Sequence, residues 1–392
     1  MLYNRSVVTI AAFLSLAFNG LTFTFVGTSL PLIRTHLGIT IDQAGNLITL
    51  MQVGFTLFSL VAGILSDRFR CERILMSGCL LLALSSFLFC TTPLFGFNIM
   101  IFFMMGAGLG CILSGSNSLL IKIYPVRKGS ILNIHHVFFG LGSLLGPLMM
   151  NLLIAQERNW LVGYRLAGTI LLLLALTLYL SGGQTPEYVN RKVINSHLSK
   201  LLHDRQFLVI MGVNCLTTGS QVALLLLGVT FLIETKAYSL SLAGIALSLY
   251  SVAMIIGRLL CSRLLRNINH STVILTLMWM QVICLLVAWS GTGWICFLAI
   301  VMSGLTISGI YPTSLALSGI YYPQVAGSAL GLLSTVSGFG SISICWLTTH
   351  IAGLTDMQMG FTVIVLACLT GLFFFQFNYR AIQSREIGCN LK

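Results

Sequence analysis

Charge is scarce in this sequence of 392 residues: Lys, Arg, Asp and Glu together make up 8% of it, against about 25% in soluble globular domains. Apolar residue types make up 57% of the chain. The two values together exclude a soluble globular protein and an intrinsically disordered one. No basic face interleaved with aromatic residues accompanies the net charge of +12, so we expect no nucleic-acid partner. The composition predicts a chain whose solvent is lipid.

Motifs for metal binding, disulfide formation and hydrolysis are also missing. The 11 Cys residues fall mostly inside apolar runs, without a CxxC pair or a Cys/His cluster at metal-ligand spacing. The sequence contains no HExxH, no GxSxG and no GxxxxGK[ST]. We therefore expect neither a membrane-embedded enzyme nor a nucleotide-driven pump, and no cofactor or bound metal.

Long apolar runs are abundant instead. A hydrocarbon core about 30 Å thick requires about 20 mostly apolar residues per helix, and runs of that length without strand alternation are helices. The sequence predicts an all-α integral membrane protein with twelve transmembrane helices. These are expected at residues 6–31, 43–65, 73–92, 97–121, 130–154, 161–181, 207–233, 241–262, 271–290, 294–318, 326–349 and 358–379.

A polar stretch between the sixth and seventh runs divides the chain into two halves of six helices. We expect an N-terminal half over 1–182, a cytoplasmic linker over 183–206, a C-terminal half over 207–380 and a cytoplasmic tail over 381–392. If Arg5 is cytoplasmic, alternation of the loops places seventeen of the 21 Lys and Arg residues on its side. Because cytoplasmic loops are enriched in Lys and Arg, this bias predicts that both termini are cytoplasmic.

The two halves carry a repeated pattern. Tyr124-Pro125 is followed by Gly129-Ser130, Leu132, Gly140 and Gly142, and each of these residue types recurs 198 positions later, beginning at Tyr322-Pro323. A repeat at half the chain length predicts a parallel duplication, with pseudo-symmetric halves related by an axis along the membrane normal.

The loop after the second run, Gly63-Ile-Leu-Ser-Asp67-Arg68-Phe-Arg70-Cys-Glu72-Arg73, resembles the major facilitator superfamily signature G-x-L-x-D-R-x-x-R-R. Without the resemblance, a solvated positive loop would explain it equally well. The resemblance implies a secondary transporter that alternates access by rocking its halves around a central site. The gating residues would be Gly63, Asp67, Arg68 and Arg73, with Gly257 and Arg258 in the second half.

A narrower resemblance lies in the fifth run. Leu132-Asn133-Ile-His135-His136-Val-Phe138-Phe139-Gly140-Leu-Gly142, closing with Gly146-Pro147, is similar to the motif L-N-x-x-H-x-F-F-G-x-G-x-x-x-G-P. That motif belongs to the fucose/glucose/galactose:proton symporter family. The resemblance implies a sugar as substrate and a proton as coupling ion.

Polar side chains inside the runs are the candidates for substrate binding. Asn133, His136 and Gly140 share one helical face by their spacing. An amide or imidazole at membrane depth is costly unless it faces a cavity or a partner. Together with the cavity helices that the resemblance implies, this predicts substrate contacts from Asn19, Asn117, Asn133, His136, Asn214, Gln221 and Tyr311.

None of the nine acidic residues lies in the middle of an apolar run. The resemblance implies acids in the first and fourth runs, and Leu113 stands where the second of them would be. Only His136 or His135 could then carry a coupling proton near neutral pH. Proton coupling through histidine, facilitated diffusion and exchange all stay open.

We therefore expect a monomeric carrier of a small polar solute, such as a sugar or a similar neutral metabolite, in a bacterial inner (plasma) membrane. The alternative is an exporter of drugs, siderophores or other amphipathic metabolites. The 24 Phe and 15 Met residues would suit its adaptable apolar cavity, although they face lipid equally well.

Overall fold

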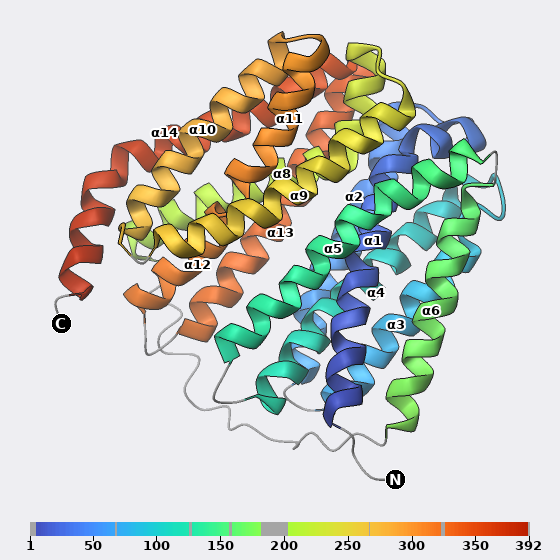
Figure 1. Ribbon diagram of the computed structural model, residues 1–392, viewed down its shortest axis with the longest axis horizontal. Helices are drawn as coiled ribbons and strands as arrows, with labels where there is room; N and C mark the ends of the chain where they lie inside the picture. The colour runs from blue at the N-terminus through green and yellow to red at the C-terminus, as the bar shows by residue number, and fades with distance from the viewer. Residues whose placement is uncertain are drawn as a thin grey trace. The chain divides into compact units, whose positions relative to one another are not determined.

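The computed structural model describes residues 5–66, 69–124, 128–156, 159–181, 203–265, 267–322 and 326–390. In these residues the secondary structure is helical, without strands (Figure 1). The first six helices are α1 (Arg5–Leu37), α2 (Ile41–Ser66), α3 (Cys71–Leu88), α4 (Phe95–Ile123), α5 (Lys128–Ala155) and α6 (Leu161–Leu180).

Seven further helices follow residue 203. They are α8 (Arg205–Lys236), α9 (Leu240–Leu264), α10 (His270–Ser290), α11 (Gly293–Ile307), α12 (Ile310–Tyr321), α13 (Ala326–Leu354) and α14 (Met357–Asn390). The pair α11 and α12 forms one membrane-length segment, Gly293–Ser318, interrupted after Ile307.

Twelve segments of the described chain are long and apolar enough to cross a membrane, which confirms the predicted fold class. Their bounds lie within a few residues of the predicted runs at most ends. The last helix differs, because α14 continues through the segment expected to be a tail and ends at Asn390. In this extension Arg385 forms an ion pair with Asp204, the N-cap of α8, and Glu386 contacts His270 at the start of α10, and both contacts stabilise the extra helical turns.

Backbone contacts group the chain into two compact units. One contains Met1–Val189 with Ser239–Ser248, and the other contains Asn190–Tyr238 with Leu249–Lys392. Within the first unit, α1 packs on α4, α5 and α6, and α4 also packs on α2 and α3. Within the second unit, α8 packs on α13 and α14, and α10 packs on α11 and α14.

Both units contain the same close helix crossing. A Cβ added to Gly142 of α5 would lie 1.8 Å from the Ala17 oxygen of α1, and one added to Gly340 of α13 would lie 1.9 Å from the Cys215 oxygen of α8. Gly142 and Gly340 belong to the repeat at offset 198, and so do their partners Ala17 and Cys215. Small residues allow such backbone contact between membrane helices. The sequence repeat therefore reappears as a repeated packing arrangement.

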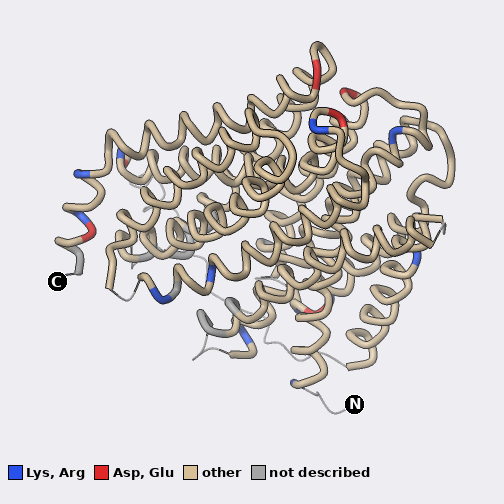
Figure 2. Tube along the Cα trace, turned by 45° about the horizontal axis from the view of Figure 1, so that its top comes forward, with Lys and Arg blue, Asp and Glu red and all other residues tan. Residues whose placement is uncertain are grey.

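Charged residues gather near the helix ends, with long uncharged stretches between them (Figure 2). Several cations bind the last carbonyl groups of a neighbouring helix. Arg5 donates from Nη2 to the Ile123 oxygen at 2.6 Å, and Lys122 donates from Nζ to the Ser66 oxygen at 2.6 Å. A cation beside a helix C-terminus satisfies free carbonyls and complements the helix dipole. These cations are part of the packing, in addition to any role in membrane orientation.

Candidate functional site

In the first unit, His135 of α5 lies at the centre of a small polar cluster. Its ring is fully buried, with Nδ1 3.1 Å from Asn117 Oδ1 of α4 and Nε2 3.3 Å from the Ala12 oxygen of α1. Asn117, a predicted substrate contact, is half-buried. The cluster therefore links three helices of one unit through neutral hydrogen-bonding groups.

The neighbouring predicted residues differ in their surroundings. His136 is half-buried, and its ring centroid lies 5.8 Å from that of His135. Asn19 is 2% exposed and donates from Nδ2 to the Leu109 oxygen of α4 at 2.7 Å, so its amide is engaged in helix packing. Asn133 lies in α5, but its side chain is outside the described part of the structure.

In the second unit, Gln221 of α8 and Arg258 of α9 both approach the Met254 sulfur. Gln221 Nε2 lies 3.2 Å from Met254 Sδ, and Arg258 Nη2 lies 3.9 Å from it. Arg258 Nε is buried without a hydrogen-bond partner among the described residues. Arg258, predicted as a gating residue, thus shares a contact with a predicted substrate residue.

The remaining two predicted substrate residues also lie in this unit. Asn214 is fully buried and donates to the Ile210 oxygen of its own helix at 2.8 Å, while no described residue donates to its Oδ1. Tyr311 stands one residue after the start of α12, and its hydroxyl lies 2.8 Å from Ser334 Oγ of α13. The interruption between α11 and α12 lies three residues before this tyrosine.

The predicted gate around the α2–α3 connection is only partly described. Asp67 and Arg68 lie outside the described residues, and Arg73 is an exposed residue of the first turn of α3. Close packing at Gly63 is not observed, since no described atom lies within 4 Å of the position its Cβ would take. Lys122 of α4, which the sequence analysis did not select, is bonded to the end of α2 here.

Gly257, the other predicted gating glycine, does make a close approach. A Cβ there would lie 2.3 Å from the Leu305 oxygen and 2.3 Å from Ser308 Oγ, so α9 and α11 cross in near contact. Close helix packing is therefore present at Gly257, in the second half of the chain, and is not observed at Gly63, in the first half.

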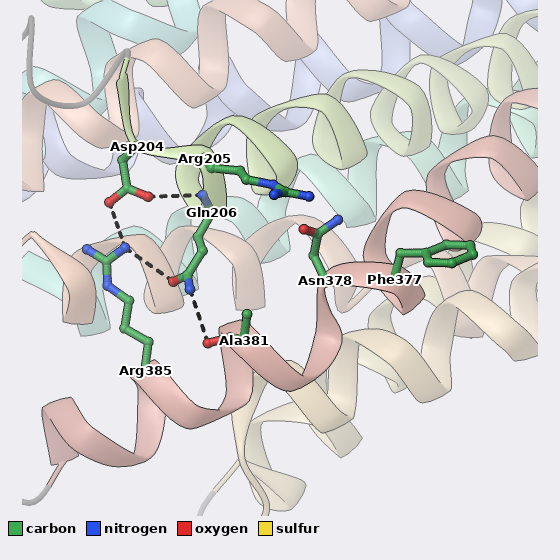
Figure 3. A pocket seen from close by; sticks show the side chains of 7 residues that line it. All are labelled: Asp204, Arg205, Gln206, Phe377, Asn378, Ala381 and Arg385. Atoms are coloured by element: carbon green, nitrogen blue, oxygen red, sulfur yellow. Dashed lines mark hydrogen bonds and ion pairs between the residues drawn. The ribbon is translucent and has the colours of Figure 1, made fainter.

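A charged cluster that no sequence motif indicates joins α8, α14 and the residue after α12 in the second unit. Figure 3 shows its Asp204, Gln206 and Arg385. Asp204 caps α8 by accepting from the Gln206 backbone nitrogen at 2.9 Å. Arg385 of α14 donates from Nη1 to Asp204 Oδ2 at 2.6 Å, and the hydroxyl of Tyr322, directly after α12, donates to the same oxygen. Burial opposes the ionisation of Asp204, but these hydrogen bonds outweigh it and hold its pKa below the usual 3.8. Burial and the hydrogen bond to Asp204 raise the pKa of Tyr322 to about 12.

A buried carboxylate, that of Glu386, stabilises the start of α10. Glu386 accepts hydrogen bonds from the His270 and Ser271 backbone nitrogens at 2.6 and 3.0 Å, and from Ser271 Oγ at 2.7 Å. A carboxylate at a helix N-terminus satisfies free N–H groups and complements the helix dipole. No signal in the local sequence could identify this cap, because Glu386 and the backbone nitrogen of His270 that it accepts from are 116 positions apart.

Metal coordination finds no support in the described residues, which contain no group of three or more His, Cys, Asp and Glu side chains able to hold an ion. The predicted substrate residues whose side chains the structure describes carry amides, an imidazole and a phenolic hydroxyl. Such groups can bind an uncharged polar molecule by hydrogen bonds.

Known proteins resemble this chain along most of its length. It is 23% identical over 345 residues to the glucose/mannose transporter GlcP of Bacillus subtilis, covering 84% of each chain. Among solved structures, the nucleoside transporter NupG has a TM-score of 0.79 at 13% identity, covering 95% of this chain and 98% of its own. FucP in the outward conformation has a TM-score of 0.65 at 18% identity, covering 95% and 98%.

Family membership rests on a match that spans both units. The family model for the Major Facilitator Superfamily matches residues 12–343 and 210–386. Twelve membrane-length segments among the described residues and the shared crossing in the two units agree with it. This multi-pass membrane protein therefore belongs to the Major Facilitator Superfamily.

Proposed function

We propose that this chain is a secondary transporter that moves a small polar solute, a sugar or a similar neutral metabolite, by alternating access. Its site of action would be a bacterial inner membrane, with both chain termini in the cytoplasm. The proposal rests chiefly on the neutral hydrogen-bonding groups inside the spans, such as His135, Asn117, Gln221 and Tyr311. Amides, hydroxyls and imidazoles can exchange hydrogen bonds with sugar hydroxyls without requiring a charge on the solute.

Two relatives support a sugar as the substrate class. GlcP is a glucose/mannose transporter, and FucP is a fucose:proton symporter. The similarity to GlcP covers 84% of both chains. We therefore favour hexoses as the first substrates to test.

The second candidate function is export of an amphipathic metabolite or drug. The observation in its favour is the thioether of Met254, which both Gln221 and Arg258 approach. A methionine side chain is flexible and polarisable, and it adapts to apolar surfaces of different shape. A carrier of hydrophobic dyes would use this adaptability.

Counterflow in proteoliposomes tests the proposal. Labelled hexoses, nucleosides and hydrophobic dyes would each be offered to vesicles loaded with the unlabelled compound. We expect saturable exchange of at least one hexose, and exchange of dyes alone would favour the exporter.

A histidine variant tests the residue assignment. We expect His136→Ala to lower hexose exchange about tenfold or more, which corresponds to about 1.4 kcal/mol. His36→Ala removes an exposed histidine at the end of α1 and provides the matched control. Equal exchange by the two variants would contradict a binding role for His136.

Proton coupling would rest on the pair His135 and His136, whose ring centroids lie 5.8 Å apart in α5. Uptake driven by an imposed pH gradient would support coupling through histidine. Uptake that ignores the gradient would favour facilitated diffusion or exchange.

A further inference from the structure

A cavity of about 460 Å³ lies beside the first turn of α8 and the last turns of α14 (Figure 3). Its lining comes from both helices and combines cationic, amide and aromatic side chains. The lining residues are Asp204, Arg205, Gln206, Phe377, Asn378, Ala381 and Arg385.

The charged side chains around this cavity differ in whether they have hydrogen-bond or ion-pair partners. Asp204 is paired with Arg385 at 2.6 Å and also accepts from two backbone N–H groups of α8. Gln206 Nε2 donates to the Ala381 oxygen at 3.2 Å. Because Asp204 already occupies the N–H groups of the helix start, an additional ligand would have to bind side chains.

Arg205 is the cation of this lining that is not paired with any described residue. Its side chain is exposed, points across the cavity toward Asn378, and makes no hydrogen bond or ion pair with any residue that the structure describes. With Arg385 neutralised by Asp204, the lining keeps one unbalanced positive charge. A guanidinium binds phosphate oxygens well, because its planar donors match them in pairs.

The location of the cavity indicates the kind of phosphate. Arg205 is the first residue of one membrane-length segment, and Asn378 lies in the last third of another, so the cavity is at the depth where spans meet water. Beside it, α14 exposes a row of aromatic side chains: Phe373 is 62% exposed, Phe374 54% and Phe377 72%. A soluble anion gains nothing from that surface, whereas the acyl chain of a lipid would cover it.

We propose that this cavity binds the phosphate of an anionic phospholipid, with Arg205 as the binding cation, Asn378 as a hydrogen-bonding partner and the acyl chains against Phe377. Basic pockets between transmembrane helices at the membrane surface are suited to such headgroups. The predicted topology places this end of the helices at the cytoplasmic leaflet. The proposal does not depend on which solute is transported.

Native mass spectrometry of the full chain in detergent tests the proposal with three probes: phosphatidylglycerol, phosphatidylcholine and inorganic phosphate. We expect retained phosphatidylglycerol, little phosphatidylcholine, and no displacement of lipid by inorganic phosphate. Arg205→Gln should weaken phosphatidylglycerol binding about fivefold, the effect of removing one cation near a membrane surface.

Arg380→Gln is the matched control, because Arg380 is an exposed cation of α14 that does not line the cavity. This variant should bind phosphatidylglycerol as the unaltered chain does, and Arg205→Lys should retain part of the binding. Equal losses in Arg205→Gln and Arg380→Gln would show attraction to surface charge in general and overturn the proposal. Displacement by inorganic phosphate would overturn the lipid assignment in favour of a free-anion site. Thermal melting of each variant separates loss of lipid binding from loss of folding.

Discussion

Asp204 connects three helices of the second unit through one carboxylate. It caps α8 and accepts from Arg385 of α14 and from Tyr322 at the end of α12. Its partners are 181 and 118 positions away in the sequence. Residue types alone could not predict this cluster, since neither the linker nor the last helix carries a motif that indicates the pairing.

The cluster predicts a pH-dependent contribution to stability. The pKa of Asp204 is lowered in the folded chain, so its contribution is present above the usual value of 3.8 and is lost as the pH falls through the lowered pKa. Asp204→Asn should therefore melt at a lower temperature than the unaltered chain at pH 7. The difference should shrink below pH 4 (approximately the usual pKa of an aspartate). Thermal melting in detergent across that range measures it, and a difference that is constant with pH would contradict the ionic role.

Asn19 illustrates a limit of reasoning from residue type. A buried asparagine in a span can serve a substrate or a neighbouring helix, and the sequence does not distinguish the two. Here the amide donates to the Leu109 oxygen at 2.7 Å, across the contact of α1 with α4. The substrate role predicted for it remains untested, but the packing role is clear from this bond.

We expect Asn19→Ala to lower the free energy of unfolding by about 1 kcal/mol, because a buried carbonyl loses its donor. If packing is the main role, the KM for the transported solute should change little. Asn117→Ala provides the comparison, since Asn117 is half-buried and bonded to His135. A rise in KM for Asn19→Ala that matches the rise for Asn117→Ala would assign Asn19 to the solute instead.

Among elements, the crossings of α1 with α5 and of α8 with α13 depend on single glycines. At Gly142 and Gly340 the partner backbone oxygen lies within 2 Å of where a Cβ would be, so neither position has room for a methyl group. Both glycines belong to the sequence repeat at offset 198, which identifies their positions. The repeat does not indicate which backbone they touch.

Gly142→Ala should destabilise the first unit by about 1–3 kcal/mol, the usual cost of overpacking. Gly228→Ala is the control in α8, because its Cβ would find its nearest neighbour at 3.7 Å, an ordinary van der Waals distance. Thermal melting of the two variants provides the measurement. Similar melting temperatures would mean that α1 and α5 can separate without loss of stability.

The helices themselves were largely predictable, because the thickness of the bilayer sets a minimum length for each apolar run. Their continuation beyond the apolar limit was not. The extension of α14 to Asn390 is held by the polar contacts of Arg385 and Glu386, and the interruption between α11 and α12 occurs inside an apolar run. Hydropathy contains no information about either feature.

At the scale of the whole molecule, family and fold follow from properties spread over the chain. The loop after the second run predicted a major facilitator transporter by its resemblance, and the twelve spans and the repeat agreed with that prediction. The family match over residues 12–343 and 210–386 confirmed it. The substrate does not follow in the same way. It depends on a few polar side chains, and the sequence could not distinguish those that face a solute from those that bind a neighbouring helix.

The gathering of charged residues near the helix ends has an electrical consequence. Moving one elementary charge across a membrane potential of 100 mV changes its free energy by about 2.3 kcal/mol. Cations bound to helix-end carbonyls, such as Arg5 and Lys122, remain near the membrane surfaces and cross little of this field. Exchange of a neutral solute should then proceed at nearly the same rate with and without a potassium diffusion potential across proteoliposomes. A strong dependence on voltage would reveal a charge moving through the membrane with each cycle, and a proton carried by histidine would be the first candidate.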